Sequence, residues 1–152
     1  MRELKITPIR NGTVIDHISS GLALEVLSIL RIRDRHRDST VSVALHVRSG
    51  KLGWKDIVKV ENVELTPREV NAIALIAPTA TISIIRDYRV REKRTVDLPP
   101  RIIGILRCPN PNCISNQPEP LESEFEVTDR RPTVLKCAFC ERRVDDFLHH
   151  LA

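Results

Sequence analysis

The chain has 152 residues, of which 41% are hydrophobic and 29% are charged, and its formal net charge is +4. This length allows one medium-sized domain or two small ones, and the composition is that of an ordinary globular protein. The longest stretch without a charge, residues 70–85, contains a proline and several polar groups, so we expect no membrane partner. The start, MRELKITPIRNG, lacks the apolar core of a signal peptide, which predicts a cytoplasmic protein in which disulfides are disfavoured.

The first sixty residues alternate between strand and helix patterns. Residues 12–18 predict a strand, and residues 19–32 begin with serines and carry apolar residues at helical spacing, which predicts a helix. The polar segment 33–39 is expected to be a loop. Valine and leucine then alternate with other residues along 40–47, which predicts a half-buried strand, and residues 54–60 follow the turn SGKLG as its hairpin partner.

A second helix is predicted for residues 66–78, where Thr66 and Glu69 have the spacing of a capping box. Residues 80–90 predict the next strand, and an additional strand from Tyr88 onward also fits the pattern. The resulting order, β-α-β-β-α-β, predicts a ferredoxin-like antiparallel sheet with two helices.

A stiff connection, VDLPPRIIG at residues 96–104, predicts a boundary between domains 1–97 and 98–152. The charge differs on its two sides. Residues 1–100 contain 17 Lys and Arg against 12 Asp and Glu, whereas residues 101–152 contain 7 against 8. An anionic partner is therefore expected to bind the first domain.

All four cysteines of the chain lie in the second domain, at the spacing Cys108-x4-Cys113 and Cys137-x2-Cys140. Two short knuckles of this kind can place four thiolates at the corners of a tetrahedron, which predicts one structural Zn²⁺ per chain in a small all-β, zinc-ribbon-like domain. Two disulfides and an iron–sulfur cluster are the alternatives. Four protein ligands leave no position for a substrate, so the site is not expected to be catalytic.

Two sets of polar residues in the first domain are open to more than one interpretation. Lys55 and Lys59 point the same way from one strand, and Lys93 lies in the basic run YRVREKR, so these lysines form either a solvated surface or an anion site. Asp16 and His17 are adjacent, but no matching nucleophile accompanies them, which argues against a small stand-alone enzyme.

Five segments, NGTVIDHI, GWKDIVKVEN, LALIAPTATI, CPNPNCIS and LKCAFCE, together resemble the regulatory chain of aspartate carbamoyltransferase along nearly the whole sequence. The resemblance implies a non-catalytic subunit with an N-terminal allosteric domain that binds ATP, CTP and UTP. It also implies a C-terminal zinc domain that docks on the catalytic chains. The implied assembly contains two catalytic trimers joined by three regulatory dimers and acts in pyrimidine biosynthesis.

The resemblance also implies individual site residues. In the implied nucleotide site, ribose and base would be held by Asp16, Lys59 and the backbone near Ile9 and Tyr88. The phosphates would contact Lys93, with His17 and Val90 nearby. Lys55 would assist the site, and Ile85 would line it. The implied zinc ligands are Cys108, Cys113, Cys137 and Cys140. The implied contacts with the catalytic chain are Asn110, Asn112, Glu141 and Arg142.

Two positions depart from the family pattern, because Thr7 stands where a glutamate is usual and Ser83 where an asparagine is usual. A zinc-ribbon adaptor for nucleic acid is the main rival function, suggested by a pI near 9.1. Two observations argue against it: the ribbon is the less basic part of the chain, and one Trp, one Tyr and three Phe provide few stacking platforms.

Overall fold

The computed structural model describes residues 8–118, 121–130, 132–146 and 150. The chain divides into two compact units, Met1–Asp97 and Leu98–Ala152. Each unit has a sheet of its own, with five strands in the first and four in the second among the described residues. No helix formed by the described residues is long and apolar enough to cross a membrane.

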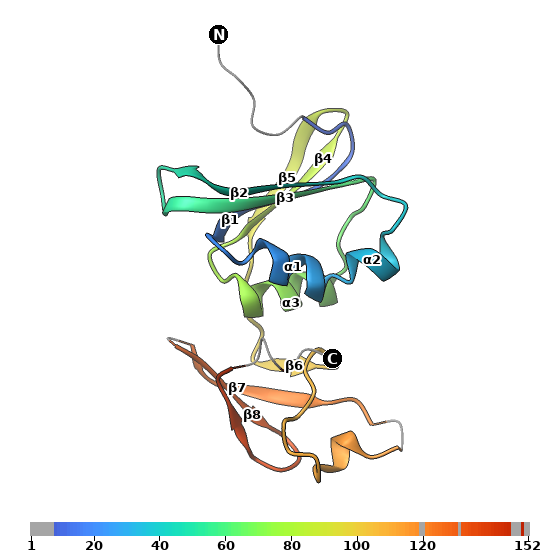
Figure 1. The fold of residues 1–152 in the computed structure, drawn as a ribbon, viewed down its shortest axis with the longest axis vertical. Helices are drawn as coiled ribbons and strands as arrows, with labels where there is room; N and C mark the ends of the chain where they lie inside the picture. The colour runs from blue at the N-terminus through green and yellow to red at the C-terminus, as the bar shows by residue number, and fades with distance from the viewer. Residues whose placement is uncertain (1–7, 119–120, 131, 147–149, 151–152) are drawn as a thin grey trace. The chain divides into compact units, whose positions relative to one another are not determined.

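The described part of the first unit contains an antiparallel sheet with the strand order β2-β3-β1-β4-β5 and helices on one face of it (Figure 1). The elements are β1 (Gly12–Ser19), α1 (Ala23–Ile29), α2 (Ile32–Arg35), β2 (Val41–Ser49), β3 (Gly53–Glu61), α3 (Pro67–Ile76), β4 (Thr81–Arg86) and β5 (Arg89–Thr95). The first four strands have the order expected for the predicted ferredoxin-like motif, and β5 is an additional edge strand.

The helical prediction for residues 19–32 is wrong in two respects. Ser19 is the last residue of β1, so the serines do not cap the helix, and the N-cap residue of α1 is Leu22. The helical segment is also interrupted at Arg31, whose φ of 52° is left-handed. A short second helix, α2, therefore occupies the start of the segment 33–39 that was predicted to be a loop.

Alternate side chains of the central strands are fully buried and form the core under the helices. Ile15 is paired with Val58 on one side and with Ile82 on the other, and these three side chains are 0–1% exposed. Because neighbouring residues along a strand point to opposite faces, residues such as Val14 and Lys59 lie on the face away from the helices, where they are half-buried. The hydrophobic pattern thus leaves one face of the sheet for polar residues.

The predicted capping box at the start of α3 is confirmed. The Glu69 backbone N–H donates to Thr66 Oγ1 over 3.2 Å, and the Thr66 N–H donates to Glu69 Oε1 over 3.0 Å. The other oxygen, Glu69 Oε2, lies 3.2 Å from His36 Nε2 and so ties the end of α2 to α3. Burial acts to raise the pKa of Glu69, but the hydrogen bonds from Thr66 and His36 hold it below its ordinary value.

The second unit is the predicted small all-β domain, with the strand order β6-β7-β8-β9. Its elements are β6 (Arg101–Ile103), the 3-10 turn η1 (Ile114–Asn116), β7 (Glu124–Arg130), β8 (Thr133–Cys137) and β9 (Arg143–Val144). The core is small. Its fully or almost fully buried apolar side chains include Ile102, Leu106, Phe125, Leu135 and Val144.

Gly12 provides a test of the central sheet, because its φ is +144° and a Cβ atom there would collide with the carbonyl oxygen of Val60 on β3. We expect Gly12→Ala to lower the free energy of unfolding by about 2–5 kcal/mol, from backbone strain and displacement of a neighbouring strand. The matched control is Gly50→Ala in the β2–β3 turn, where no heavy atom lies within 4 Å of the added Cβ. Urea unfolding that gives the same midpoint for both variants would contradict this account of β1.

Candidate functional site

A row of paired residues crosses the open face of the first sheet. The pairs between β2 and β3, β3 and β1, β1 and β4, and β4 and β5 join five residues: Ser42, Lys59, Val14, Ser83 and Lys93. Directly paired residues of antiparallel strands share a face, so the register places Lys59 and Lys93 on the same face. Three strand spacings, about 15 Å, separate the two backbones. Because lysine side chains are long, the two ammonium groups can lie closer together than the backbones do.

A second group lies beside this row, around Asp16 on β1. Asp16 Oδ1 lies 2.9 Å from Lys55 Nζ and also accepts a hydrogen bond from the His17 backbone N–H over 2.6 Å. Both partners of the ion pair are largely buried, with side-chain exposures of 17% for Lys55 and 28% for Asp16. Burial lowers the pKa of Lys59 below its ordinary value, and the Asp16 charge acts in the opposite direction. The carboxylate is thus electrostatically linked to both β3 lysines.

The backbone of β1 bulges at His17, which has a φ of 56°, and the pairing with β3 shifts between Ile15 and Ile18. Two threonines hold this bulge. Thr79 Oγ1 donates to the His17 carbonyl over 2.7 Å, and Thr81 Oγ1 lies 3.0 Å from His17 Nδ1. Sequence reasoning missed both threonines, although Thr79 lies two residues before β4 and Thr81 is its first residue, and this position beside β1 was a usable signal.

The remaining predicted nucleotide-site residues lie toward the β4–β5 turn. Ile85 pairs with both Gly12 and Val90, so it shares the face of Ser83 and Lys93. Tyr88 is in the turn itself, where its N–H donates to the Arg10 carbonyl over 2.9 Å and its side chain is exposed.

Ile9 is 5% exposed, and Val90 is exposed. Ile85 and Val90 are thus a pair of the β4–β5 ladder, whereas Tyr88 lies in the turn that joins these strands. Thr7, the position where a glutamate is usual in the family, lies outside the described residues.

Four thiols meet in the second unit, where the Sγ atoms of Cys108, Cys113, Cys137 and Cys140 all lie within 4.8 Å of one another. The Sγ atoms of Cys108 and Cys140 are 3.6 Å apart, and those of Cys113 and Cys137 are 3.7 Å apart. These separations are too long for disulfide bonds, which need about 2.05 Å, so the alternative of two disulfides is wrong. Four sulfurs at 2.3 Å from a shared tetrahedral ion would be about 3.8 Å apart, so the group could hold a metal ion.

Backbone amides surround these sulfurs. N–H groups of Asn110 and Arg142 donate to the sulfurs of Cys108 and Cys140, each two residues before its donor. Burial raises the pKa of Cys108 to about 12 and also raises that of Cys137. At Cys140 burial acts in the same direction, but hydrogen bonds from the Arg142 backbone, from Cys108 and from the Asn110 side chain lower the pKa to about 7. The pKa of the Cys140 thiol is therefore lower than those of Cys108 and Cys137.

The residues predicted to contact a catalytic chain lie on the two knuckles. Asn112, Glu141 and Arg142 are exposed, whereas Asn110 is half-buried and its Oδ1 accepts a hydrogen bond from the Asn112 backbone N–H over 3.0 Å. The Glu141 N–H donates to the Cys137 carbonyl over 2.9 Å.

Two apolar side chains that sequence reasoning did not assign to this surface, Ile114 and Phe139, are 59% and 40% exposed. Ile114 directly follows Cys113, and Phe139 lies between Cys137 and Cys140, so both belong to the same knuckles. The metal end of the unit thus presents apolar as well as polar groups.

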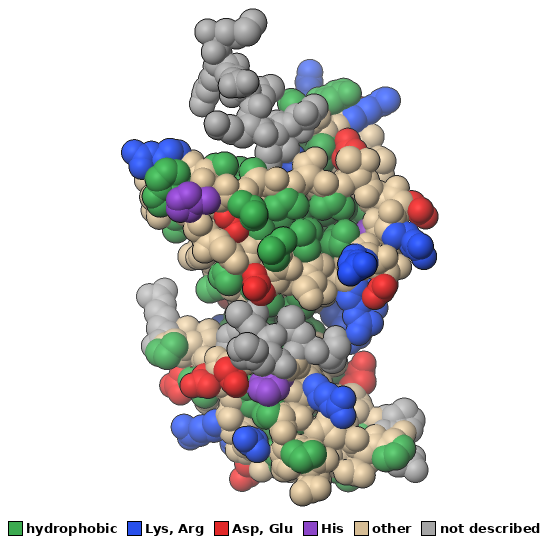
Figure 2. All heavy atoms as spheres, viewed as in Figure 1, with side chains coloured by type: hydrophobic (Ala, Val, Ile, Leu, Met, Phe, Trp, Pro, Cys, Tyr) green, Lys and Arg blue, Asp and Glu red, His purple; other side chains and the backbone are tan. Residues whose placement is uncertain are grey.

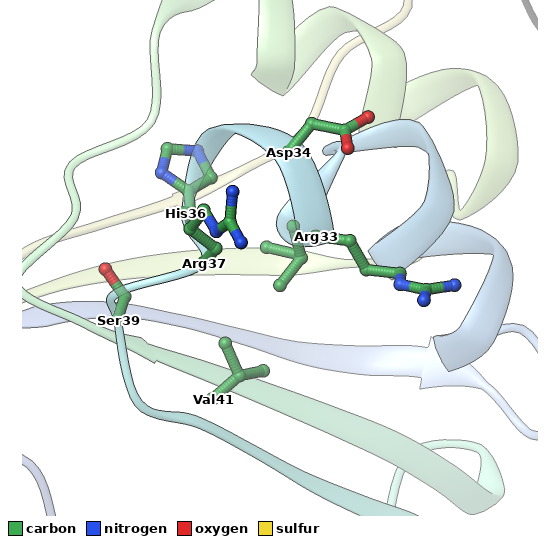
Figure 3. Close-up of a pocket in the computed structure, with 7 residues that line it drawn as sticks. Arg33, Asp34, His36, Arg37, Ser39 and Val41 are labelled. Atoms are coloured by element: carbon green, nitrogen blue, oxygen red, sulfur yellow. The ribbon is translucent and has the colours of Figure 1, made fainter.

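A separate hollow of about 820 Å³ lies between α2 and the start of β2. Its lining includes Arg33, Asp34, His36, Arg37 and Ser39, and none of the predicted site residues. Figure 3 shows Arg33 extending away from His36 and Ser39, and Asp34 pointing away from Ser39. The charged groups therefore do not converge, and the hollow lacks the arrangement of a binding site.

Comparison with known proteins identifies the family. Residues 4–97 match the model of the aspartate carbamoyltransferase regulatory chain, allosteric domain, and residues 100–147 match that of its metal binding domain. The chain belongs to the aspartate carbamoyltransferase regulatory chain family. The predicted resemblance is thereby confirmed, and the protein is a non-catalytic subunit of an enzyme complex.

Several curated relatives match nearly the whole chain and carry the name aspartate carbamoyltransferase regulatory chain. That of Thermoplasma volcanium is 53% identical over 145 residues, 95% of each chain. That of Methanothrix thermoacetophila is 57% identical over 141 residues, 93% of this chain and 91% of the relative. That of Methanothermobacter thermautotrophicus is 53% identical over 143 residues, 94% and 90% respectively.

The electrostatic link between Asp16 and Lys59 gives a prediction. Asp16→Asn removes a charge that raises the pKa of Lys59, so we expect this pKa to fall further below its ordinary value. The measurement is an NMR titration of the lysine side-chain methylene signals. The control is Glu64→Gln, which removes a carboxylate that pairs with Arg86 instead. A Lys59 pKa that rises in Asp16→Asn, or that falls equally in Glu64→Gln, would contradict the linkage.

Proposed function

We propose that this chain senses nucleotides for aspartate carbamoyltransferase in cytoplasmic pyrimidine biosynthesis. The first unit would bind ATP, CTP or UTP, and the second would carry a structural zinc ion and dock on catalytic chains. The observation that carries the nucleotide assignment is the shared face of Lys59 and Lys93, two cations on separate strands of one sheet. The assembly proposed is two catalytic trimers joined by three regulatory dimers.

A triphosphate and a nucleoside need different surroundings, and the open face of the sheet provides both. Lys93 on the edge strand β5 is exposed and suits phosphate oxygens, with His17 and the backbone at Val90 as further contacts. Asp16 and Lys59 lie deeper and are suited to ribose hydroxyls and base edges. Lys55, paired with Asp16, would hold that carboxylate in place. Ser83 lies in the same row and offers a hydroxyl in place of the usual amide.

Zinc is the metal that we infer for the four-thiol group. The sulfur separations of 3.6 and 3.7 Å fit a single tetrahedral ion. An iron–sulfur cluster would have to separate thiolates bound to different irons more widely than 4.8 Å allows. Bound zinc would supply folding energy and hold the two knuckles together, and all four ligand positions would be filled by the chain.

The docking assignment rests on how the second unit presents its knuckle residues. Asn112, Glu141 and Arg142 are exposed polar groups on backbone that the thiol group and its N–H donors hold in place. A rigid surface loses less conformational entropy when it binds. The exposed side chains of Ile114 and Phe139 would add apolar contact area.

Pairing of two regulatory chains is also proposed, and the first unit has a surface that suits it. Figure 2 shows hydrophobic side chains gathered on one face of this unit. Its exposed large apolar residues include Leu24 on α1 and Val43 and Leu45 on the edge strand β2. An edge strand with exposed apolar side chains is a typical surface for association with another chain.

Salt dependence separates this function from the nucleic-acid alternative. A protein that neutralises many phosphates loses affinity steeply as salt rises, because counterions are released on binding. Binding of one nucleotide should weaken far less between low and moderate salt.

The metal prediction is one zinc per chain. Since coupled metal binding and folding contributes on the order of 10–16 kcal/mol, removal with a mercurial and a chelator should unfold the second unit and release the catalytic partner. The first unit, which has its own core, should keep its circular dichroism signal. Elemental analysis that finds iron, or no metal in reduced and folded chain, would refute the assignment.

The nucleotide prediction concerns Lys93. Loss of charge-assisted hydrogen bonds in Lys93→Ala should weaken CTP or ATP binding by about 1.5–3 kcal/mol. The control is Lys51→Ala, in the turn between β2 and β3 and outside the proposed site, which should change binding little. Calorimetry that shows equal, small effects for the two variants would remove the site assignment.

The docking prediction concerns Asn112, whose side chain is exposed. Its backbone N–H donates to Asn110 Oδ1 and is retained in an alanine variant. We expect Asn112→Ala to leave nucleotide binding to the regulatory chain intact. It should weaken assembly with catalytic chains and reduce the nucleotide response of aspartate saturation. Assembly of unchanged affinity, measured by titration of catalytic trimers, together with a full nucleotide response, would show that the knuckle is not the docking surface.

A further inference from the structure

The side-chain amide of Asn116, at the end of the 3-10 turn η1, reaches back across the first cysteine knuckle. Its Nδ2 atom donates to the Cys108 carbonyl over 2.8 Å and to the Asn110 carbonyl over 2.7 Å. An asparagine amide has two N–H donors, so both are used on this loop. The side chain is half-buried, which strengthens the requirement that these groups be paired.

The sequence of the loop explains why a side chain has this role. The first knuckle has four residues between its cysteines, and two of them, Pro109 and Pro111, have no backbone N–H. After Cys108, the only residues of the loop with a backbone N–H are Asn110, Asn112 and Cys113. The Asn110 N–H is directed to the Cys108 sulfur, and the Asn112 N–H to the Asn110 side chain.

The Cys108 carbonyl has no backbone donor among the hydrogen bonds of the described loop residues, and the Asn116 amide is its donor there. The Asn110 carbonyl accepts from the Cys113 N–H over 3.0 Å and from Asn116. The Asn116 backbone N–H in turn donates to the Cys113 carbonyl over 2.9 Å. One residue thus joins both ends of the knuckle.

The second knuckle needs no such residue. It has only two residues between Cys137 and Cys140, and a backbone hydrogen bond from the Glu141 N–H to the Cys137 carbonyl closes it. In the longer, proline-containing loop, no backbone N–H of the described residues closes onto the carbonyl of the first cysteine, Cys108, in this way. The difference between the two knuckles therefore points to a specific compensating function for Asn116.

We propose that Asn116 is a positioning residue: its amide fixes the Cys108–Cys113 loop in the geometry that binds the metal ion and, through Asn110, orients the loop that presents Asn112. Asn116 is not one of the proposed metal ligands or partner contacts, and it acts through the backbone carbonyls of Cys108 and Asn110, which are. The neighbouring Ser115 Oγ lies 3.1 Å from Cys113 Sγ and gives the same turn a second contact with a ligand. The proposal rests on the proposed metal site.

The test uses the full chain and compares Asn116→Ala and Asn116→Asp with the wild type. The aspartate variant keeps the size of the side chain but removes both N–H donors. Zinc affinity is measured by competition with a chromophoric chelator, and the site geometry by the visible absorption of the Co²⁺-substituted chain. Outer-sphere partners of metal ligands typically contribute 10–100-fold to metal affinity, so both variants should bind zinc about 10–100-fold more weakly. Both should also show an altered Co²⁺ spectrum.

Two controls separate this role from a general loss of stability. Ile102→Val removes a methyl group from the buried core at β6, and Gln117→Ala changes the exposed neighbour of Asn116. Neither should alter the Co²⁺ spectrum. If Asn116→Ala does not fold, Asn116→Asp decides the question.

Wild-type zinc affinity and an unchanged Co²⁺ spectrum in the aspartate variant would overturn the proposal, and so would effects no larger than those of Ile102→Val. In both cases the proposed zinc site would stand. A wild-type chain that binds neither Zn²⁺ nor Co²⁺ would overturn both.

Discussion

The convergence of four thiols is the constraint on which the second unit depends. A unit of about fifty residues buries a modest fraction of its surface, and here the buried apolar core is a short list of side chains such as Phe125 and Leu135. The cysteines come in two pairs, Cys108 with Cys113 and Cys137 with Cys140. Strand β7 and most of β8 lie between the pairs, so joining them closes a long stretch of chain. The N–H donors around the sulfurs and the amide of Asn116 hold the loops in a shape that the thin core alone would not specify.

The first unit is stabilised differently. Helices cover one face of its sheet, and the buried row through Ile15 forms a conventional core. The opposite face is then available for polar side chains. An antiparallel register aligns residues from distant parts of the sequence, and this alignment brings Lys59 and Lys93 to one surface although β1 and β4 lie between their strands.

In the proposed regulation, one unit binds the nucleotide and the other contacts the catalytic chains, so the effect must pass between two units. Coupling between effector and substrate sites is typically 1–3 kcal/mol and is reciprocal for binding. An effect of this size is easily lost if the connecting surfaces are mobile. Rigid knuckles that present Asn112 and Arg142 would preserve it, because little binding energy would be consumed in ordering the contact.

The sequence by itself determined the class of each unit, the capping box at Thr66, the four-cysteine group and the family. These features depend on local spacing: helical or strand periodicity, a cap three residues from its partner, and short intervals between cysteines. It did not determine the break at Arg31 or the short helix after it. Arg31 has a left-handed backbone, but arginine is a common residue within helices, so its residue type does not indicate a break.

Tertiary structure alone decided which residues meet across strands. Three contacts illustrate this: the pairing of Ser83 with Lys93, the two threonines that hold His17, and the Asn116 amide on the Cys108 carbonyl. Each joins positions that no helical or strand periodicity relates. Their placement follows from strand register and from the need to pair buried polar groups. Both conditions are met only when the whole unit has folded, so they are properties of the three-dimensional arrangement and not of any segment.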